Sequence, residues 1–218
     1  AGWREIFKPW LRNALIIAVG IMFFQQFVGI NTVIYYSPKI FLAAGFEGNE
    51  AAIAAAVIVG VVNVLFTIVS LFVIDRLGRR KLFFIGVSGI TIALISMGLG
   101  FMIEGVSKWF LVTSMLVYIA FFAISLGPLG WLIITEVFPT RVRGLGSSIG
   151  SLSNWGFNTL VVWTFFKMAS AFGNAKDVVV PEGSDLSSVC PTCVGSVFWV
   201  FAAVALIGLV WGYFFIPE

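Results

Sequence analysis

The sequence predicts an all-α membrane protein with six transmembrane helices. Of its 218 residues, 60% are hydrophobic and only 11% are charged, and its mean hydropathy is +1.07. A soluble domain carries about one quarter charged residues. Apolar runs of twenty or more residues recur along the chain, each long enough to cross a hydrocarbon layer about 30 Å thick. Most of the molecular surface is therefore expected to face lipid.

The apolar runs predict helices and not strands. Backbone polar groups inside a bilayer need internal partners, and the period-two alternation of a transmembrane β-strand is absent from the sequence. To within several residues at each edge, the expected spans are 13–37, 51–74, 82–103, 109–135, 144–168 and 195–216. The longest connection, about 173–194, is polar and predicts a surface loop. Its Cys190 and Cys193 are too few for a four-ligand structural zinc site and are either a disulfide or thiols without function.

The basic residues predict the orientation of the spans. One side of the membrane collects Arg4, Lys8, Arg12, Arg76, Arg79, Arg80, Lys81, Arg141 and Arg143. The other side has Lys39, Lys108, Lys167 and Lys176. Because cytoplasmic loops carry an excess of Lys and Arg, the first side is expected to be cytoplasmic, together with both chain ends. The start of the chain lacks a signal-peptide pattern, and we expect it to lie within a longer protein.

Two of the six spans are expected to be interrupted. The first contains Gly29 among polar residues, and the fourth contains Gly127, Pro128 and Gly130. Proline removes a helix donor and glycine loosens the backbone. Interruptions in the first and fourth spans are typical of two three-helix repeats of opposite topology, whose broken helices line a substrate site near the midplane. The alternative is an ordinary kink, which membrane helices tolerate.

The centres of the spans lack ionisable side chains, and the chain has no histidine. This pattern excludes proton relays and voltage sensors from this part of the chain. An enzyme would need a catalytic acid, base, nucleophile or metal ligand in the membrane, and a channel would need a charged or carbonyl-lined filter. We therefore expect neither of these classes, and no cofactor or bound metal.

The spans carry uncharged carboxamides instead. Each amide offers two donors and an acceptor, which suits the hydroxyl groups of a polyol. The six amides are Gln25, Gln26, Asn31, Asn63, Asn154 and Asn158. Asn154 and Asn158 are four residues apart and share a helix face. Amides can also join helices by hydrogen bonds, but six of them in three spans favour a polar cavity.

Aromatic side chains next to the expected interruptions are candidate partners for a sugar. Trp131 follows the break in the fourth span and could stack on the apolar face of a sugar ring. Tyr35 and Tyr36 follow the break in the first span and could close its outer end.

Acids and arginines alternate at the expected cytoplasmic ends of the helices. They occur in the segments DRLGRR (75–80) and EVFPTRVR (136–143). Such residues can form bidentate ion pairs that hold helix ends together in one conformation. Simple topogenic charge is the alternative, but it does not account for the acids.

These motifs together resemble the sugar porter family of the major facilitator superfamily. The matching segments occur in the family's order over essentially the whole chain: FQQFVGIN (24–31), YYSP (35–38), DRLGRR (75–80), GPLGW (127–131), EVFPTRVRG (136–144), SNW (153–155) and PE (217–218). The resemblance implies one half of a major facilitator fold, with the six spans as helices seven to twelve of twelve. The partner would be an N-terminal six-helix half of the same transporter.

The family resemblance also implies roles for individual residues. It places Gln25, Gln26, Asn31, Asn63, Trp131, Asn154 and Asn158 at or near a bound monosaccharide. It assigns Tyr35 and Tyr36 to an outer gate. It assigns Asp75, Arg76, Arg79, Arg80, Glu136, Arg141, Arg143 and Glu218 to a cytoplasmic ion-pair latch.

The implied activity is alternating-access transport of a hexose or pentose across a plasma membrane or a bacterial inner membrane. Ala123, eight residues before Trp131, stands where some mammalian glucose facilitators carry a glutamate, which favours the bacterial or plant-like branch. Proton coupling stays open because the family's coupling acid lies in the other half. Facilitated transport of a polyol such as inositol, and a six-helix half that homodimerises, are the alternatives.

Overall fold

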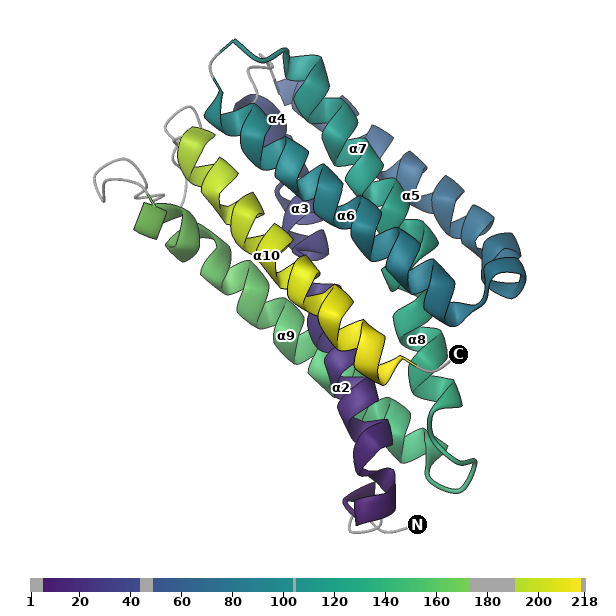
Figure 1. Ribbon diagram of the computed structural model, residues 1–218. Coiled ribbons are helices and arrows are strands. Elements are labelled where there is room, and N and C mark those ends of the chain that lie inside the picture. Colours follow the sequence, from purple (N-terminus) through teal and green to yellow (C-terminus); the bar gives the residue numbers. More distant parts are fainter. Residues whose placement is uncertain (1–5, 44–48, 104, 173–190, 217–218) are drawn as a thin grey trace.

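The computed structural model describes residues 6–43, 49–103, 105–172 and 191–216. Over these ranges the regular structure is entirely helical, and the long helices run side by side as one bundle (Figure 1). The all-α class predicted from the sequence is confirmed.

The first expected span, 13–37, is divided between α2 (Arg12–Phe27) and α3 (Ile30–Tyr35), with a short helix on either side of it. The short helices are η1 (Pro9–Leu11) and α4 (Ser37–Ala43). The main interruption lies at Gly29, whose φ of 88° is left-handed and suits glycine. A side chain at this position would also strike the ring of Phe201. Gly29 therefore breaks the helix where the sequence predicted and allows close packing against the last helix.

The fourth expected span is also divided, but not where its glycines suggested. Helix α7 (Lys108–Ile124) ends and α8 (Leu126–Glu136) begins on either side of Ser125, which has φ −115° and ψ −91°. The predicted break at Gly127, Pro128 and Gly130 is therefore wrong by about two residues. Pro128 lies in the first turn of α8, where its missing N–H costs little. The helix breaks before the proline because the proline cannot bond to the Ile124 carbonyl.

The remaining helices are continuous. They are α5 (Asn49–Leu77), α6 (Arg79–Met102), α9 (Arg143–Phe172) and α10 (Pro191–Phe215). Because α10 begins at Pro191, the final residues of the expected loop 173–194 are helical. Residues 173–190, with Cys190, lie outside the described part of the chain.

Five spans among the described residues are long and apolar enough to cross a membrane. They are Pro9–Tyr35, Ile53–Leu77, Arg79–Met102, Lys108–Glu136 and Val194–Phe215. Helix α9 is 30 residues long but is not among them. Its polar residues account for this: Ser147, Ser148, Ser151, Ser153, Asn154 and Asn158. The count of six spans is therefore not confirmed, and a membrane crossing by α9 stays a prediction.

The helices pack through large side chains against small ones. Helix α10 lies along α6, and α6 lies along α7 (Figure 1). The ring of Phe83 on α6 packs against Gly212 on α10, where no larger residue would fit. On the other side of the bundle α2 packs against α9 and α8, which brings together the helices that carry most of the amides.

Helix α5 is the least covered of the spans. Only 17% of its apolar window is buried, against 44% to 61% for the other four. Its exposed side chains are large and apolar, among them Val57, Val61, Leu65 and Phe72. This face therefore needs lipid or another apolar surface to cover it.

Candidate substrate site

Gln25 forms the centre of a buried amide network between three helices. Its side chain is 3% exposed, and its Nε2 donates to the carbonyl oxygens of Leu126 and Gly127 at 2.8 and 3.0 Å. Its Oε1 accepts a hydrogen bond from Asn154 Nδ2 at 2.5 Å. Asn154 also reaches Met22 Sδ at 3.2 Å. The two amides thus join α2, α8 and α9 in the manner of interhelical hydrogen bonds.

Gly130 makes room for this network. A Cβ atom at position 130 would lie 2.7 Å from Gln25 Nε2. Gly130, the second glycine of the GPLGW segment, therefore lets the Gln25 amide approach the first turn of α8.

Gln26 and Asn31 form a second amide pair across the break at Gly29. Asn31 Nδ2 donates to Gln26 Oε1 at 2.7 Å. Gln26 is 5% exposed and Asn31 is half-buried. This bond leaves two donors on Gln26 Nε2 and an acceptor on Asn31 Oδ1 for other partners.

A cavity of about 480 Å³ lies between α3 and α9. It is lined by Tyr35, Tyr36, Asn158, Thr159, Val162 and Trp163. The volume falls in the range of about 300–1,000 Å³ that is usual for small-molecule sites. The structure thus brings both predicted gate tyrosines together with one of the predicted sugar-binding amides.

Asn158 is the residue of this lining whose side chain has an unused hydrogen-bonding group. Its side chain is 7% exposed, and its Oδ1 is buried without a hydrogen-bond partner among the described residues. A buried acceptor left without a partner costs about 1–3 kcal/mol. The Asn158 oxygen is therefore a hydrogen-bond acceptor that the described part of the protein does not use.

The aromatic walls of the cavity are held by neighbouring side chains. The Tyr36 ring stacks on Phe165 with centroids 5.4 Å apart. Trp163 is exposed, and Lys167 Nζ lies 3.6 Å from the centroid of its ring, in a cation–π contact. The lining of the cavity thus combines aromatic ring surface with the polar side chain of Asn158.

Sequence reasoning missed the contributions of Thr159, Val162 and Trp163. Their spacing contains a usable signal, because Val162 lies four residues after Asn158, and Trp163 lies four residues after Thr159, on one helix. Trp163 was overlooked because the chain is rich in aromatic residues, most of which pack or face lipid.

Of the seven predicted sugar-binding residues, Asn158 lines this cavity and the other six do not. The four other amides of α2, α3 and α9 lie in the two networks described above, and Trp131 and Asn63 lie on other helices. Trp131 is 42% exposed on α8, and Asn63 is half-buried on α5. Helix α5 packs against α7 and α4. Contact of these two side chains with a ligand stays a prediction.

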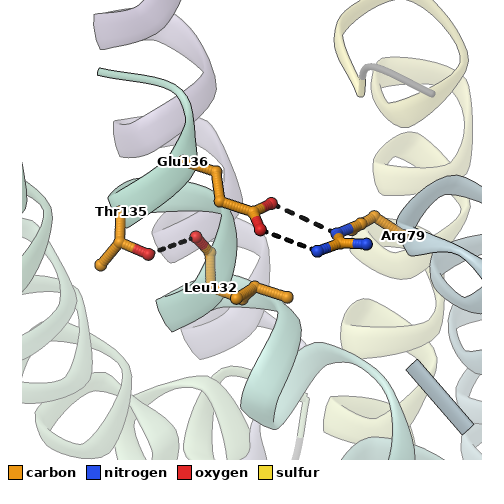
Figure 2. A network of polar contacts seen from close by, with 4 residues as sticks. All are labelled: Arg79, Leu132, Thr135 and Glu136. Carbon is orange, nitrogen blue, oxygen red and sulfur yellow. Dashed lines mark hydrogen bonds and ion pairs between the residues drawn. The ribbon is translucent and has the colours of Figure 1, made fainter. Parts of the chain in front are cut away.

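One bidentate ion pair joins helix ends in the predicted latch. Arg79, the first residue of α6, donates from Nη2 and Nε to the two carboxylate oxygens of Glu136 at 2.8 and 3.3 Å (Figure 2). Glu136 is the last residue of α8. Both side chains are more than one third exposed, so the pair adds at most about 1 kcal/mol to stability.

The other latch residues are arranged differently. Arg80 Nη2 donates to the Tyr213 carbonyl oxygen at 3.2 Å, and its guanidinium carbon lies 5.7 Å from the centroid of the Tyr213 ring. This contact ties α6 to the end of α10. Arg143 reaches the Phe138 carbonyl at 3.5 Å, which is a weak contact.

The remainder of the latch set lies at the surface or outside the described residues. Asp75, Arg76 and Arg141 are exposed, and Glu218 is beyond the described ranges. Within the predicted set, the structure shows the Arg79–Glu136 ion pair and the contact of Arg80 with the end of α10.

The apolar helices of membrane-spanning length define an integral membrane protein, and a cavity with Asn158 in its lining lies between α3 and α9. The chain belongs to the sugar (and other) transporter family, whose family model matches residues 1–218. The resemblance to the sugar porters is thereby confirmed. The family and the relatives are transporters and not enzymes.

Characterised relatives support this membership. The chain is 41% identical over 175 residues to a D-xylose transporter of Levilactobacillus brevis, covering 79% of this chain and 38% of the relative. It is 34% identical over 218 residues to the D-xylose-proton symporter-like 1 protein of Arabidopsis thaliana, covering 100% and 39% of the two chains. It is 35% identical to the glucose transporter GlcP of Staphylococcus epidermidis, covering 99% and 44%.

Solved structures have the same fold. A crystal structure of a D-xylose-proton symporter matches with a TM-score of 0.80 at 31% identity, covering 99% of this chain and 46% of that one. The inward open xylose transporter XylE from E. coli matches with a TM-score of 0.72 at 29% identity, covering 98% and 40%. The chain thus spans less than half the length of these relatives.

Proposed function

We propose that the full-length protein carries a neutral monosaccharide, a hexose or a pentose, across the membrane by alternating access. The described chain would be its C-terminal half, with α9 as the fifth of six spans and with two inverted three-helix repeats. It would rock against an N-terminal six-helix half around a midplane site. Both ends would face the cytoplasm of a plasma membrane or bacterial inner membrane. The relatives named for xylose and glucose transport support the substrate class.

The observation that carries this proposal is the cavity around Asn158. Its lining is uncharged and combines a buried, unpartnered amide oxygen with tyrosine and tryptophan rings. A sugar presents hydroxyl donors to such an oxygen and apolar C–H faces to such rings. A charged solute would find no counter-ion among these six lining residues.

The amides would divide into two functional groups. Gln26, Asn31 and Asn158 have hydrogen-bonding capacity left for a sugar, so we assign them to direct contact. Gln25 and Asn154 have their main donors bound to other helices, so we assign them to holding the site together.

The remaining predicted residues would complete the transport cycle. Trp131 and Asn63 would join the site from α8 and α5 when the other half is present. Tyr35 and Tyr36 would close the outer end. The Arg79–Glu136 pair would favour one conformation to the extent that it separates in the other.

Uptake by the full-length protein in proteoliposomes tests the proposal. We expect saturable uptake of labelled D-xylose or D-glucose, competed by unlabelled monosaccharide. Asn158→Ala should lower kcat/KM at least about tenfold, the weight of a ligand hydrogen bond of about 1.5 kcal/mol. Asn13→Ala, on an exposed asparagine at the start of α2, is the matched control and should leave uptake unchanged. Absence of saturable monosaccharide uptake would refute the proposal.

Transport of a polyol is a second candidate, favoured by the 33% identity to polyol transporter 5 of Arabidopsis thaliana. Competition of labelled xylose uptake by inositol, compared with glucose and galactose, separates the two substrates.

The coupling mode and the assembly need separate measurements. Two of the relatives are named as proton symporters, so a proton gradient should drive accumulation if coupling passes through the other half. The molecular mass of the described chain in detergent would reveal a homodimer of six-helix halves.

A further inference from the structure

A buried tyrosine lies at the interruption of the first span. Tyr118 of α7 is fully buried, and its hydroxyl donates to the Val28 carbonyl oxygen at 2.9 Å. Val28 immediately precedes Gly29. In an unbroken helix the Val28 oxygen would accept the N–H of Thr32, four residues on. The Tyr118 hydroxyl therefore binds a carbonyl that the break at Gly29 has freed.

A second hydroxyl, three residues after the break at Gly29, has no partner among the described residues. Thr32 is fully buried, and its Oγ1 makes no hydrogen bond within the described residues. Elsewhere in these helices threonine hydroxyls donate to the carbonyl four residues earlier, at 2.7 to 3.0 Å: Thr67, Thr91, Thr159 and Thr164 do so. The corresponding acceptor for Thr32 is the Val28 oxygen. In a continuous helix this oxygen would accept both the N–H and the hydroxyl of Thr32, which uses both of its lone pairs and leaves none for Tyr118.

We infer that Tyr118 is a positioning residue that holds the first span in its broken form, and that the Thr32 hydroxyl replaces it on Val28 when the segment winds into a continuous helix. In the broken form the Tyr118 hydroxyl is bonded to the Val28 carbonyl and the Thr32 hydroxyl has no partner among the described residues. In the continuous form the Thr32 hydroxyl would be bonded to that carbonyl and the Tyr118 hydroxyl would have lost it. The two hydroxyls thus make the join between α2 and α3 a two-state element.

This inference rests on the proposed function because the break positions proposed sugar contacts. Gln26 lies before the break, and Asn31 and Tyr35 lie after it. Winding the helix through Gly29 would rotate α3 relative to α9 and so change the cavity around Asn158. Tyr118 would act on the sugar site through the backbone without touching the sugar.

Cysteine labelling of the purified full-length protein in detergent tests the inference without a sugar. The reporter is Val162→Cys, in the wall of the cavity, with Cys190 and Cys193 replaced by serine. Tyr118→Phe removes only the hydroxyl and should slow maleimide labelling about two- to tenfold, the weight of one hydrogen bond. Adding Thr32→Val removes the competing hydroxyl and should restore the rate toward that of the parent.

Two controls separate this exchange of hydroxyls on the Val28 carbonyl from a general loss of packing. Thr32→Ser keeps the hydroxyl and should not restore labelling in the Tyr118→Phe protein. Tyr213→Phe, at an exposed tyrosine whose ring and carbonyl make the contacts to Arg80, should label like the parent.

The inference is overturned if Tyr118→Phe labels at the parent rate, or if Thr32→Val and Thr32→Ser act alike in that background. If Tyr118→Phe does not fold, labelling of Thr32→Val decides, since it should exceed that of Thr32→Ser. Because the readout needs no substrate, failed monosaccharide uptake would refute the proposed function and leave this result standing.

Discussion

The Gln25 amide should contribute more to stability than its neighbour Gln26. The substitution Gln25→Met keeps the length of the side chain but removes two donated hydrogen bonds and the one accepted from Asn154. Gln26→Met makes the same chemical change but removes only the bond accepted from Asn31. The two variants therefore form a matched pair at adjacent positions of one helix.

The expected magnitude follows from the number of bonds lost. Interhelical hydrogen bonds in membrane proteins average about 0.6 kcal/mol. Three bonds at Gln25 then amount to about 2 kcal/mol of unfolding free energy, and the single bond at Gln26 to about 0.6 kcal/mol. A loss of about 2 kcal/mol lowers the thermal midpoint of a unit of this size by about 4 °C or more.

Thermal unfolding of the purified full-length protein in detergent, followed beside sugar uptake, measures both effects. Gln25→Met should lower Tm about threefold more than Gln26→Met. Gln26→Met should instead raise KM, because this amide has donors left for the sugar. Equal Tm losses, or a larger loss for Gln26→Met, would refute the division of the amides into helix-joining and sugar-contacting groups.

Three further predictions concern the surroundings of the site. Gly130→Ala places a methyl group 2.7 Å from Gln25 Nε2 and should lower the unfolding free energy by about 1–3 kcal/mol, measured by thermal unfolding; an unchanged Tm would show that Gln25 moves freely. A double-mutant cycle of Arg79→Gln and Glu136→Gln should give a coupling below about 1 kcal/mol that falls with added salt, and a salt-independent coupling would contradict an exposed pair. Trp163→Ala should raise KM for sugar several-fold with little change in Tm, because the indole is exposed and lines the cavity; a lower Tm with unchanged KM would assign it to packing.

The class of protein and one of its two breaks could be predicted from the sequence. Long runs of apolar residues are not stable when they are exposed to water, so the composition alone predicts membrane-spanning helices. Gly29 was predicted correctly because a glycine among polar residues inside an apolar run favours an interrupted helix. The second break lies at Ser125, before the residues at which it was predicted. A proline removes the hydrogen bond to the carbonyl four positions earlier, so the helix ends before the proline and not at it.

The roles of the individual amides could not be read from their positions. Gln25 and Gln26 are adjacent, yet one bonds to α8 and α9 and the other to Asn31. Asn154 and Asn158 share a face of α9, yet one bonds to Gln25 and the other lines the cavity. The partners of each amide depend on which carbonyl or side chain a second helix presents, and that is a property of the packed bundle.

The predicted ion-pair latch shows the same limit on what the sequence could predict. The segments that carry Arg79 and Glu136 were recognised as a set of charges. The specific pairing required the end of α8 to lie beside the start of α6, and the break at Ser125 helps to set the direction of α8.

Substrate protection of the cavity tests the central claim most directly. The reporter is Thr159→Cys in the full-length protein, with Cys190 and Cys193 replaced by serine. Monosaccharides should slow maleimide labelling, with half-protection at the concentration that half-saturates uptake, and charged solutes of similar size should not. Labelling that is indifferent to every sugar the protein transports would contradict the claim that the sugar binds between α3 and α9.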